Sequence, residues 1–274
     1  MVASSERVFI VGGTGNIGVK VVKDLVAKNI PVTLYARQPE KVNTLFGNNS
    51  LISVVQGDYN DLAPIKEGLK GHTRLFLLIA DLQVIVHLKK TIAAWAYEAG
   101  VKQVVDVSGI AASFPNRTSA IGTRSYEAEQ AIYNLPNRGA FVALRPGRFM
   151  SNVLTFERIH EDAIIDKSDP DAHVEKHGDS VYELISDVVT PAQRAEIFSR
   201  VLGRPIKYKK VTALEKYDML MQHKVFSHSM VFSICTTFAS FDVHTPTVTD
   251  GIQILLRREP ETFEKFITDN KHLL

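Results

Sequence analysis

Residues 7–18 read RVFIVGGTGNIG, and this stretch decides the fold. Arg7–Val11 is a short apolar run of the kind expected for a strand buried on both faces of a parallel sheet. Ile17–Lys28 repeats apolar residues at helical spacing. A glycine-rich turn joins the two segments. This arrangement predicts that a dinucleotide binds there with its pyrophosphate on the helix N-terminus. The candidate ligands of this turn are Gly12, Thr14, Gly15, Asn16, Ile17 and Gly18.

The same alternation of strand and helix continues to about residue 145. The predicted strands are Arg7–Val11, Val32–Ala36, Leu51–Gln56, Leu75–Ile79, Gln103–Val107 and Ala140–Leu144. The predicted helices between them are Ile17–Lys28, Gln38–Phe46, Asp61–Leu69, Val84–Ala99 and Thr123–Leu135. Alternation at this spacing indicates an α/β protein with a doubly wound parallel sheet, the Rossmann arrangement.

The alternation of strands and helices ends after Arg145, and the second part of the chain is predicted to be mostly helical. We expect residues 1–152 to form the dinucleotide-binding domain and residues 153–274 a small substrate-side region packed on it. The expected strands there are Tyr182–Ile185 and Ile206–Tyr208. The expected helices are Pro191–Leu202, Ala213–Gln222, Val225–Ala239, Val248–Leu256 and Pro260–Asn270, and Pro170–Gly178 is expected to be a loop.

The end of the second predicted strand favours NADP(H) over NAD(H). An acidic residue there would accept hydrogen bonds from a ribose 2′-hydroxyl, but the strand ends in Ala36-Arg37. Arg37 can pair with a 2′-phosphate through a charge-assisted fork, and Lys41 adds positive charge nearby. The alternative is that Arg37 and Lys41 are ordinary solvated charges.

Ligands of a doubly wound sheet lie at the carboxyl ends of its strands, so the other strand ends are also candidate sites. Asp58 can accept from an adenine amino group and Tyr59 can pack on the ring, although Asp58 also suits a turn or helix cap. Ile79 and Ala80 are expected near the pyrophosphate or the nicotinamide ribose. Ser108 is expected at the reacting end of the cofactor.

Composition excludes several function classes. The 274 residues carry 32 Lys+Arg against 30 Asp+Glu, a formal charge of +2 that gives no support to nucleic-acid or membrane-surface binding. The apolar stretch Leu75–Leu88 is too short and too interrupted to span a bilayer. Cys235 is the only cysteine, which favours a reducing compartment, and we expect a cytoplasmic protein. The sequence has no metal-binding motif and no nucleophile elbow.

The chain resembles the NmrA-like branch of the atypical short-chain dehydrogenases/reductases. The matching stretches include GGTGNIG at 12–18, VVQGDYND at 54–61, EAGVKQVVDVSG at 98–109 and LRPGRFMSN at 144–152. The resemblance implies NADP(H) binding, a Rossmann domain and a small-molecule substrate. It also implies that Pro146, Gly147 and Phe149 lie beside the nicotinamide.

Two departures from the family pattern concern catalysis. Short-chain dehydrogenases use Tyr-x-x-x-Lys, in which the lysine lowers the pKa of the tyrosine, but here the window runs from Tyr126 to Gln130. Many active relatives carry a basic residue at the position of Ser125. Tyr126 and Ser108 remain as candidate catalytic residues, although Tyr126 equally suits simple packing. The resemblance also makes the segment Val153–Val181 about 30 residues short, with His160–Ile164 as a remnant of an Asp-Ile motif that opens a helix.

Two functions therefore stay open at this point. The first is an NADP(H)-dependent oxidoreductase that passes hydride to a quinone-like or conjugated carbonyl or imine acceptor. The second is a non-catalytic NADP(H) sensor that acts through a protein partner. A homodimer is compatible with either function.

Overall fold

The structure is a computed structural model that describes residues 6–114, 119–154, 157, 163–166, 181–222, 226–240 and 248–274. The chain divides into two compact units. The first comprises Met1–Ser108, Arg124–Leu144 and Gly178–Val181, and the second comprises Gly109–Thr123, Arg145–His177 and Tyr182–Leu274. The domain boundary that the sequence suggests at residue 152 stays a prediction.

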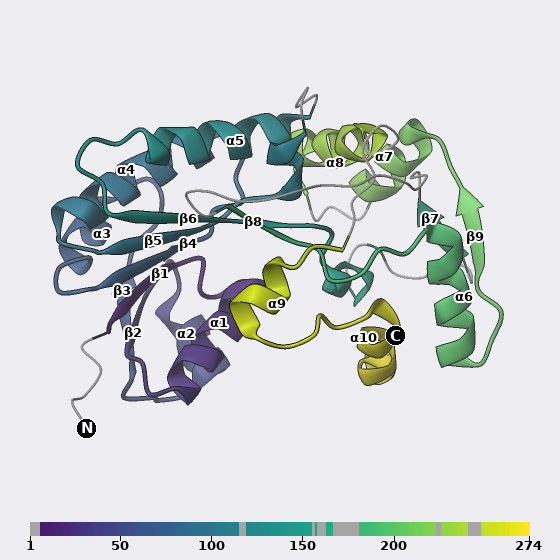
Figure 1. Ribbon diagram of the computed structural model, residues 1–274, viewed down its shortest axis with the longest axis horizontal. Helices are drawn as coiled ribbons and strands as arrows, with labels where there is room; N and C mark the ends of the chain where they lie inside the picture. Colours follow the sequence, from purple (N-terminus) through teal and green to yellow (C-terminus); the bar gives the residue numbers. More distant parts are fainter. Residues whose placement is uncertain are drawn as a thin grey trace. The chain divides into compact units, whose positions relative to one another are not determined.

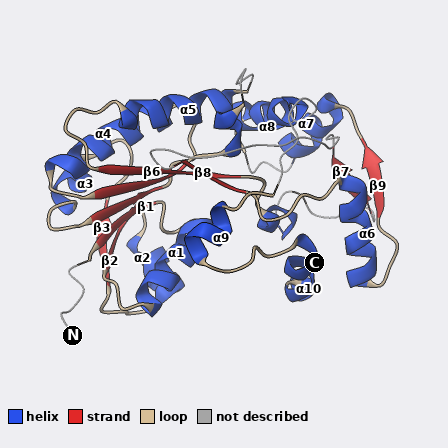
Figure 2. Ribbon diagram, in the orientation of Figure 1, coloured by secondary structure: helices blue, strands red, loops and turns tan. Residues whose placement is uncertain are grey.

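A parallel sheet forms the centre of the first unit, as predicted (Figures 1 and 2). Its strand order is β3-β2-β1-β4-β5-β6-β8, and β1 to β6 pair in parallel. The order reverses at β1, which lies between β2 and β4, and such a switch point is where doubly wound sheets bind ligands. The strands are β1 Val8–Val11, β2 Val32–Ala36, β3 Ile52–Gln56, β4 Arg74–Leu77, β5 Gln103–Val107, β6 Ala140–Pro146 and β8 Val181–Leu184, of which β8 belongs to the second unit from Tyr182 onward.

Helices cover both faces of this sheet because alternate side chains of each strand point to opposite faces. Val8 and Ile10 pack in one core with α1 and α2, whereas Phe9 and Val11 pack in the other with α3, α4 and α5. The helices are α1 Asn16–Ala27, α2 Pro39–Phe46, α3 Ala63–Gly68, α4 Ile85–Glu98 and α5 Ala120–Tyr133.

The second unit is mostly helical, as predicted, with two small cores of its own. One core joins α6 and α10 around the buried rings of Phe198 and Phe263, and the other joins α7 and α8. Its elements are β7 Ala163–Asp166, α6 Pro191–Leu202, β9 Lys207–Lys210, α7 Ala213–Gln222, α8 His228–Ser240, α9 Gly251–Leu256 and α10 Phe263–Asp269, with single 3₁₀ turns at Ile110–Ser113, Met150–Leu154 and Lys271–Leu273.

Several predicted boundaries in the second unit were wrong. Helix α10 begins at Phe263 rather than Pro260, because the Thr262 hydroxyl accepts the N–H of Lys265 and caps the helix there. Helices α8 and α9 also begin three residues later than predicted.

The Asp-Ile motif opens a helix in the family pattern, whereas in this chain Ala163–Asp166, which overlaps the suggested remnant, forms β7 and pairs in parallel with β9. The rest of that remnant and the predicted loop Pro170–Gly178 lie outside the described residues. No helix in the described ranges combines the length and the apolar character needed to cross a bilayer.

Candidate functional site

Three glycines of the turn after β1 are closely packed, two of them against backbone atoms. Gly12 has a φ of +88°, and a Cβ atom on it would lie 2.5 Å from the carbonyl oxygen of Leu78. A Cβ atom on Gly18 would lie 2.1 Å from the Gly12 oxygen, and one on Gly13 would lie 2.6 Å from a Leu34 methyl group. These glycines let the first turn of α1 lie directly against the end of β1.

Gly15 differs from its neighbours because nothing in the protein crowds it. Its backbone is extended, with φ −88° and ψ 172°, and a Cβ atom would meet only the Gly12 oxygen, at 3.6 Å. Gly15 is the N-cap of α1, no side chain caps the helix there, and its first turn carries no acidic residue. The N–H groups of Asn16, Ile17 and Gly18 have no intrahelical acceptor at this end of the helix, so the turn can receive a phosphate group.

A second group of candidate ligands lies at the ends of β2 and β3. Arg37 and Lys41 are exposed, and Lys41 occupies the first turn of α2. Burial raises the pKa of Tyr59, and the positive charge of Arg37 partly offsets this. The two residues follow the ends of the adjacent strands β2 and β3. A cationic side chain beside a half-exposed ring fits the adenosine end of a dinucleotide carrying a 2′-phosphate.

The ring of Tyr59 packs against the ring of Tyr35. The two rings are stacked with their centroids 6.4 Å apart, and the Tyr35 hydroxyl donates to the carbonyl oxygens of Asp58, at 2.6 Å, and Asp61, at 3.1 Å. Burial raises the pKa of Tyr35 to about 12. One carboxylate oxygen of Asp58 accepts the N–H of Asn60 at 2.8 Å, so this carboxylate stabilises the turn.

The ends of β4 and β5 complete the candidate site of the first unit. Ile79 is buried and Ala80 is exposed, and the preceding N–H, of Leu78, donates to Val11 at 3.1 Å. Ser108 follows β5 directly and is half-buried, and its N–H donates to Leu144 at 2.8 Å. Its hydroxyl donates to the carboxylate of Glu129 on α5.

Ser108 lies next to a cluster of buried charged residues that was not predicted from the sequence. Lys89 on α4 and Asp106 on β5 are both fully buried and form an ion pair at 2.6 Å. The Lys89 ammonium also donates to the Val107 carbonyl at 2.9 Å. Burial raises the pKa of Asp106; the Lys89 charge lowers it and the Glu129 charge raises it further. Glu129 is itself only 3% exposed.

The sequence did contain a signal for this cluster. Lys89 lies on the apolar face of α4, beside Leu88 and Ile92, where a charged side chain is shielded from solvent. Asp106 falls on the same face of β5 as the buried Val104. A charge in a buried position of each of two adjacent elements indicates an internal ion pair.

The remaining candidates lie elsewhere. Tyr126 is half-buried on α5, between the buried Ser125 and the half-buried Glu127. Pro146, Gly147 and Phe149 belong to the second unit, where the Gly147 N–H donates to Leu184 at 3.2 Å and Phe149 is 39% exposed.

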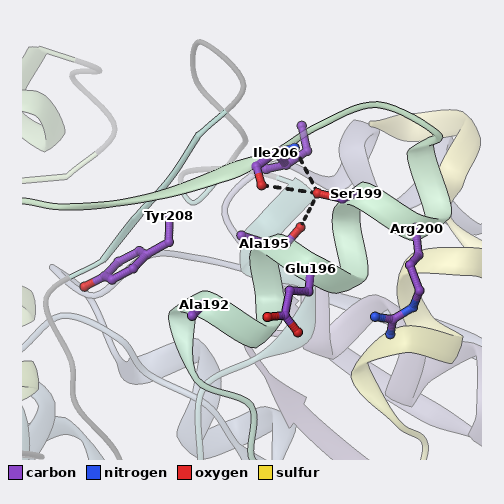
Figure 3. A pocket seen from close by; sticks show the side chains of 7 residues that line it. All are labelled: Ala192, Ala195, Glu196, Ser199, Arg200, Ile206 and Tyr208. Atoms are coloured by element: carbon purple, nitrogen blue, oxygen red, sulfur yellow. Dashed lines mark hydrogen bonds between the residues drawn. The ribbon is translucent and has the colours of Figure 1, made fainter.

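A hollow of about 480 Å³ opens in the second unit beside α6 and β9 (Figure 3). Two of its polar side chains, Ser199 and Arg200, bond within the protein. The Ser199 hydroxyl bonds to Ala195 and Ile206, and Arg200 forms an ion pair with Glu264 at 2.9 Å. Among the described residues, no group of three or more His, Cys, Asp or Glu side chains could hold a metal ion.

Comparison with known proteins agrees with this geometry. Residues 12–175 match a family described as NAD(P)H-binding. The chain belongs to this family. It is 30% identical over 224 residues, 74% of this chain and 77% of the relative, to (4-alkanoyl-5-oxo-2,5-dihydrofuran-3-yl)methyl phosphate reductase of Streptomyces griseus. It is 25% identical to an NAD(P)H azoreductase of Xenophilus azovorans over 94% of this chain and 96% of that one.

Solved structures share this fold over nearly the full length of the chain. The Escherichia coli quinone oxidoreductase QOR2 complexed with NADPH superposes with a TM-score of 0.77 at 18% identity, over 96% of this chain and 99% of that one. NmrA, a negative transcriptional regulator, gives a TM-score of 0.71 at 15% identity, over 96% of this chain and 95% of that one. The chain is thus an NAD(P)H-binding protein with the fold of NmrA and QOR2, in agreement with the resemblance that its motifs show. These coverages also show that the chain is not short beside the azoreductase or QOR2.

Proposed function

We propose that the protein is an NADP(H)-dependent reductase that passes hydride to a small organic acceptor of the quinone-like or conjugated carbonyl or imine class. The observation that carries the proposal is the turn Gly12–Gly18, which is closely packed at three glycines and open at Gly15. When bound, the dinucleotide would supply the hydride. The protein would supply position, electrostatics and a proton.

Different residues at the strand ends bind different parts of the dinucleotide. The N–H groups at the start of α1 hold the pyrophosphate, and Arg37, with Lys41, pairs with the 2′-phosphate. The adenine lies on the Tyr59 ring, which Tyr35 supports. Asp58 completes the adenine end, and Ile79 and Ala80 line the path toward Ser108. The pairing of Arg37 and Lys41 with the 2′-phosphate is the basis for preferring NADP(H) over NAD(H).

Two similarities support reduction over simple binding. The two curated relatives are named as reductases, and their alignments cover 74% and 94% of this chain. QOR2, which shares the fold, is described as an NADPH-dependent quinone oxidoreductase. A quinone-like acceptor also suits a site without Tyr-x-x-x-Lys, because such rings accept hydride with little acid assistance. We propose a cytoplasmic location on the strength of the single, buried Cys235.

The test is NADPH oxidation against a panel of quinones, enones, imines and azo compounds, with NADPH fluorescence as an independent measure of binding. We expect saturable turnover with at least one class of acceptor. Tight NADPH binding without turnover on any member of the panel would overturn the reductase and favour the sensor with a protein partner.

A further inference from the structure

The peptide group that joins Val107 to Ser108 is hydrogen-bonded at both of its polar ends. The Ser108 N–H donates to the Leu144 carbonyl of β6 at 2.8 Å, and the Val107 carbonyl accepts the Lys89 ammonium group of α4 at 2.9 Å. Lys89 also pairs at 2.6 Å with Asp106, the residue before Val107. We propose that Lys89 and Asp106 are positioning residues, which fix this peptide group and thereby the Ser108 side chain at the reacting end of the dinucleotide.

The Val107 carbonyl lies where strands β4 and β5 stop pairing. The pairing of β5 with β4 ends at Asp106, opposite Leu77, whereas its pairing with β6 continues to Val107, opposite Leu144. The C=O and N–H groups of a trans peptide point in opposite directions, and the N–H of this peptide group points to β6. The Val107 carbonyl therefore points to the β4 side, beyond the last paired residue of β4, and Lys89 supplies its donor there.

The Lys89–Asp106 ion pair is a costly way to fill this space. Both side chains are fully buried, and among the described residues the Asp106 carboxylate has no hydrogen-bond partner beyond its contact with Lys89. Burial raises the pKa of Asp106 despite the Lys89 charge, as expected of a carboxylate that has lost its hydration. Apolar side chains often stabilise such a position as well as a buried ion pair does. What they cannot supply is an ammonium group that is held by a carboxylate and directed at a backbone carbonyl.

Ser108 is placed where a fixed backbone matters for the reaction. It follows the carboxyl end of β5, at the edge of the sheet where ligands of doubly wound folds bind. Its hydroxyl donates to the Glu129 carboxylate, so α5 directs the side chain while β6 and α4 hold the backbone. Because Lys89 and Asp106 are fully buried, they can influence the reaction only through the residues that they hold in place. This inference rests on the proposed reductase function, in which Ser108 contacts the reactants.

The test removes the ion pair without leaving a buried charge. The double variant Lys89→Met/Asp106→Leu puts apolar side chains at both positions, so it should fold with most of the wild-type stability. Asp106→Asn is the conservative variant, because its amide oxygen can still accept from the ammonium group that binds Val107. Ile92→Ala is the matched control, since it opens a cavity on the same buried face of α4 without changing the contacts of the peptide group.

Amide hydrogen exchange of the ligand-free protein, resolved by residue with NMR, provides a readout that does not depend on turnover. We expect the Ser108 amide of the double variant to exchange about 10- to 100-fold faster relative to the Val104 amide in the middle of β5, because a hydrogen bond from a charged donor is lost. Asp106→Asn and Ile92→Ala should keep the ratio of the two exchange rates within about threefold of the wild-type ratio.

Steady-state reduction of a quinone by NADPH measures the consequence for the reaction. A displacement of about 1 Å can cost about 100-fold in rate, so kcat of the double variant should fall about 10- to 100-fold while its Kd for NADPH changes less than about threefold. Asp106→Asn and Ile92→Ala should keep kcat within about fivefold of the wild type. If the pair acts through Ser108, adding Ser108→Ala to the double variant should give the kcat of Ser108→Ala alone, within about twofold.

Three results would overturn the positioning role and leave the reductase standing. The first is an unchanged exchange ratio or an unchanged kcat in the double variant. The second is a loss of kcat in Ile92→Ala as large as that in the double variant. The third is a triple variant whose loss of kcat is the product of the two separate losses. A wild type that binds NADPH and reduces no acceptor would overturn both the reductase and the positioning role, even if the exchange ratio changes as expected.

Discussion

Exchanging Gly15 for alanine should separate dinucleotide binding from folding. The extended backbone at Gly15 accepts a side chain, and the new Cβ atom would lie 3.6 Å from the Gly12 oxygen, an ordinary contact. A Gly→Ala change without strain stabilises a protein by about 0.4–1 kcal/mol through the unfolded state. We therefore expect the Tm of Gly15→Ala to rise by about 1–4 °C.

The same methyl group should weaken binding, because it occupies the space through which a phosphate approaches the N-terminus of α1. Loss of one hydrogen bond to a charged group is worth about 1.5–3 kcal/mol, which corresponds to about 10- to 150-fold in Kd. Titration of NADPH fluorescence measures this loss, and differential scanning calorimetry measures the stability.

Gly18→Ala is the matched control, since its Cβ atom would lie 2.1 Å from the Gly12 oxygen and 2.6 Å from the Gly13 Cα. The backbone must move, at a cost of about 1–3 kcal/mol or more, so Gly18→Ala should lower the Tm. Undiminished NADPH affinity in a folded Gly15→Ala protein would refute the placement of the pyrophosphate. A fall in Tm as large as that of Gly18→Ala would refute the description of the turn.

Three further predictions concern charge and pH. Arg37→Ala should remove about 10- to 100-fold of the preference for NADP over NAD, measured as the ratio of the two Kd values, and an unchanged ratio would contradict the 2′-phosphate assignment. Lys89→Met should cost about 3–5 kcal/mol in urea unfolding at neutral pH because it leaves Asp106 buried without its cation. That cost should shrink as pH falls and Asp106 takes up a proton, and pairing the change with Asp106→Leu should recover most of it; a double variant no more stable than Lys89→Met would count against the pair. Because the pKa of Tyr35 is raised to about 12, the folded state holds more protons than the unfolded state between the ordinary pKa of 10.0 and that value, so stability should fall as pH rises through this window. Tyr35→Phe should remove part of that fall, since burial also raises the pKa of Tyr97 to about 12, and a Tyr35→Phe protein with the same alkaline profile would contradict the contribution of Tyr35.

The doubly wound half of the fold could be predicted because local signals agree there with tertiary structure. Strands β1 and β2 are apolar and buried on both faces, and glycines such as Gly47 and Gly100 follow the ends of helices. Boundaries failed where side-chain contacts decide them, as at Thr262, whose hydroxyl starts α10. Strand β7 was missed because its pairing with β9 links segments about 40 residues apart, which no local pattern reports.

The candidate site could likewise be predicted only in part. The glycine turn and Arg37 depend on backbone geometry and strand order, which the sequence reveals. The contact between Glu129 and Ser108 was not predicted, because it requires α5 to pack beside β5. Lys89 and Asp106 form a pair only in three dimensions, although each stands in an apolar pattern where it cannot be solvated.

The most direct test of the central claim is steady-state NADPH oxidation by the wild-type protein with a quinone as acceptor, run in parallel with NADH and with the Gly15→Ala variant. The proposed function predicts quinone-dependent turnover, a higher kcat/KM for NADPH than for NADH, and a large loss in the variant. NADPH that binds to the protein and is never oxidised, by the quinone or by any other acceptor of the panel, would contradict it.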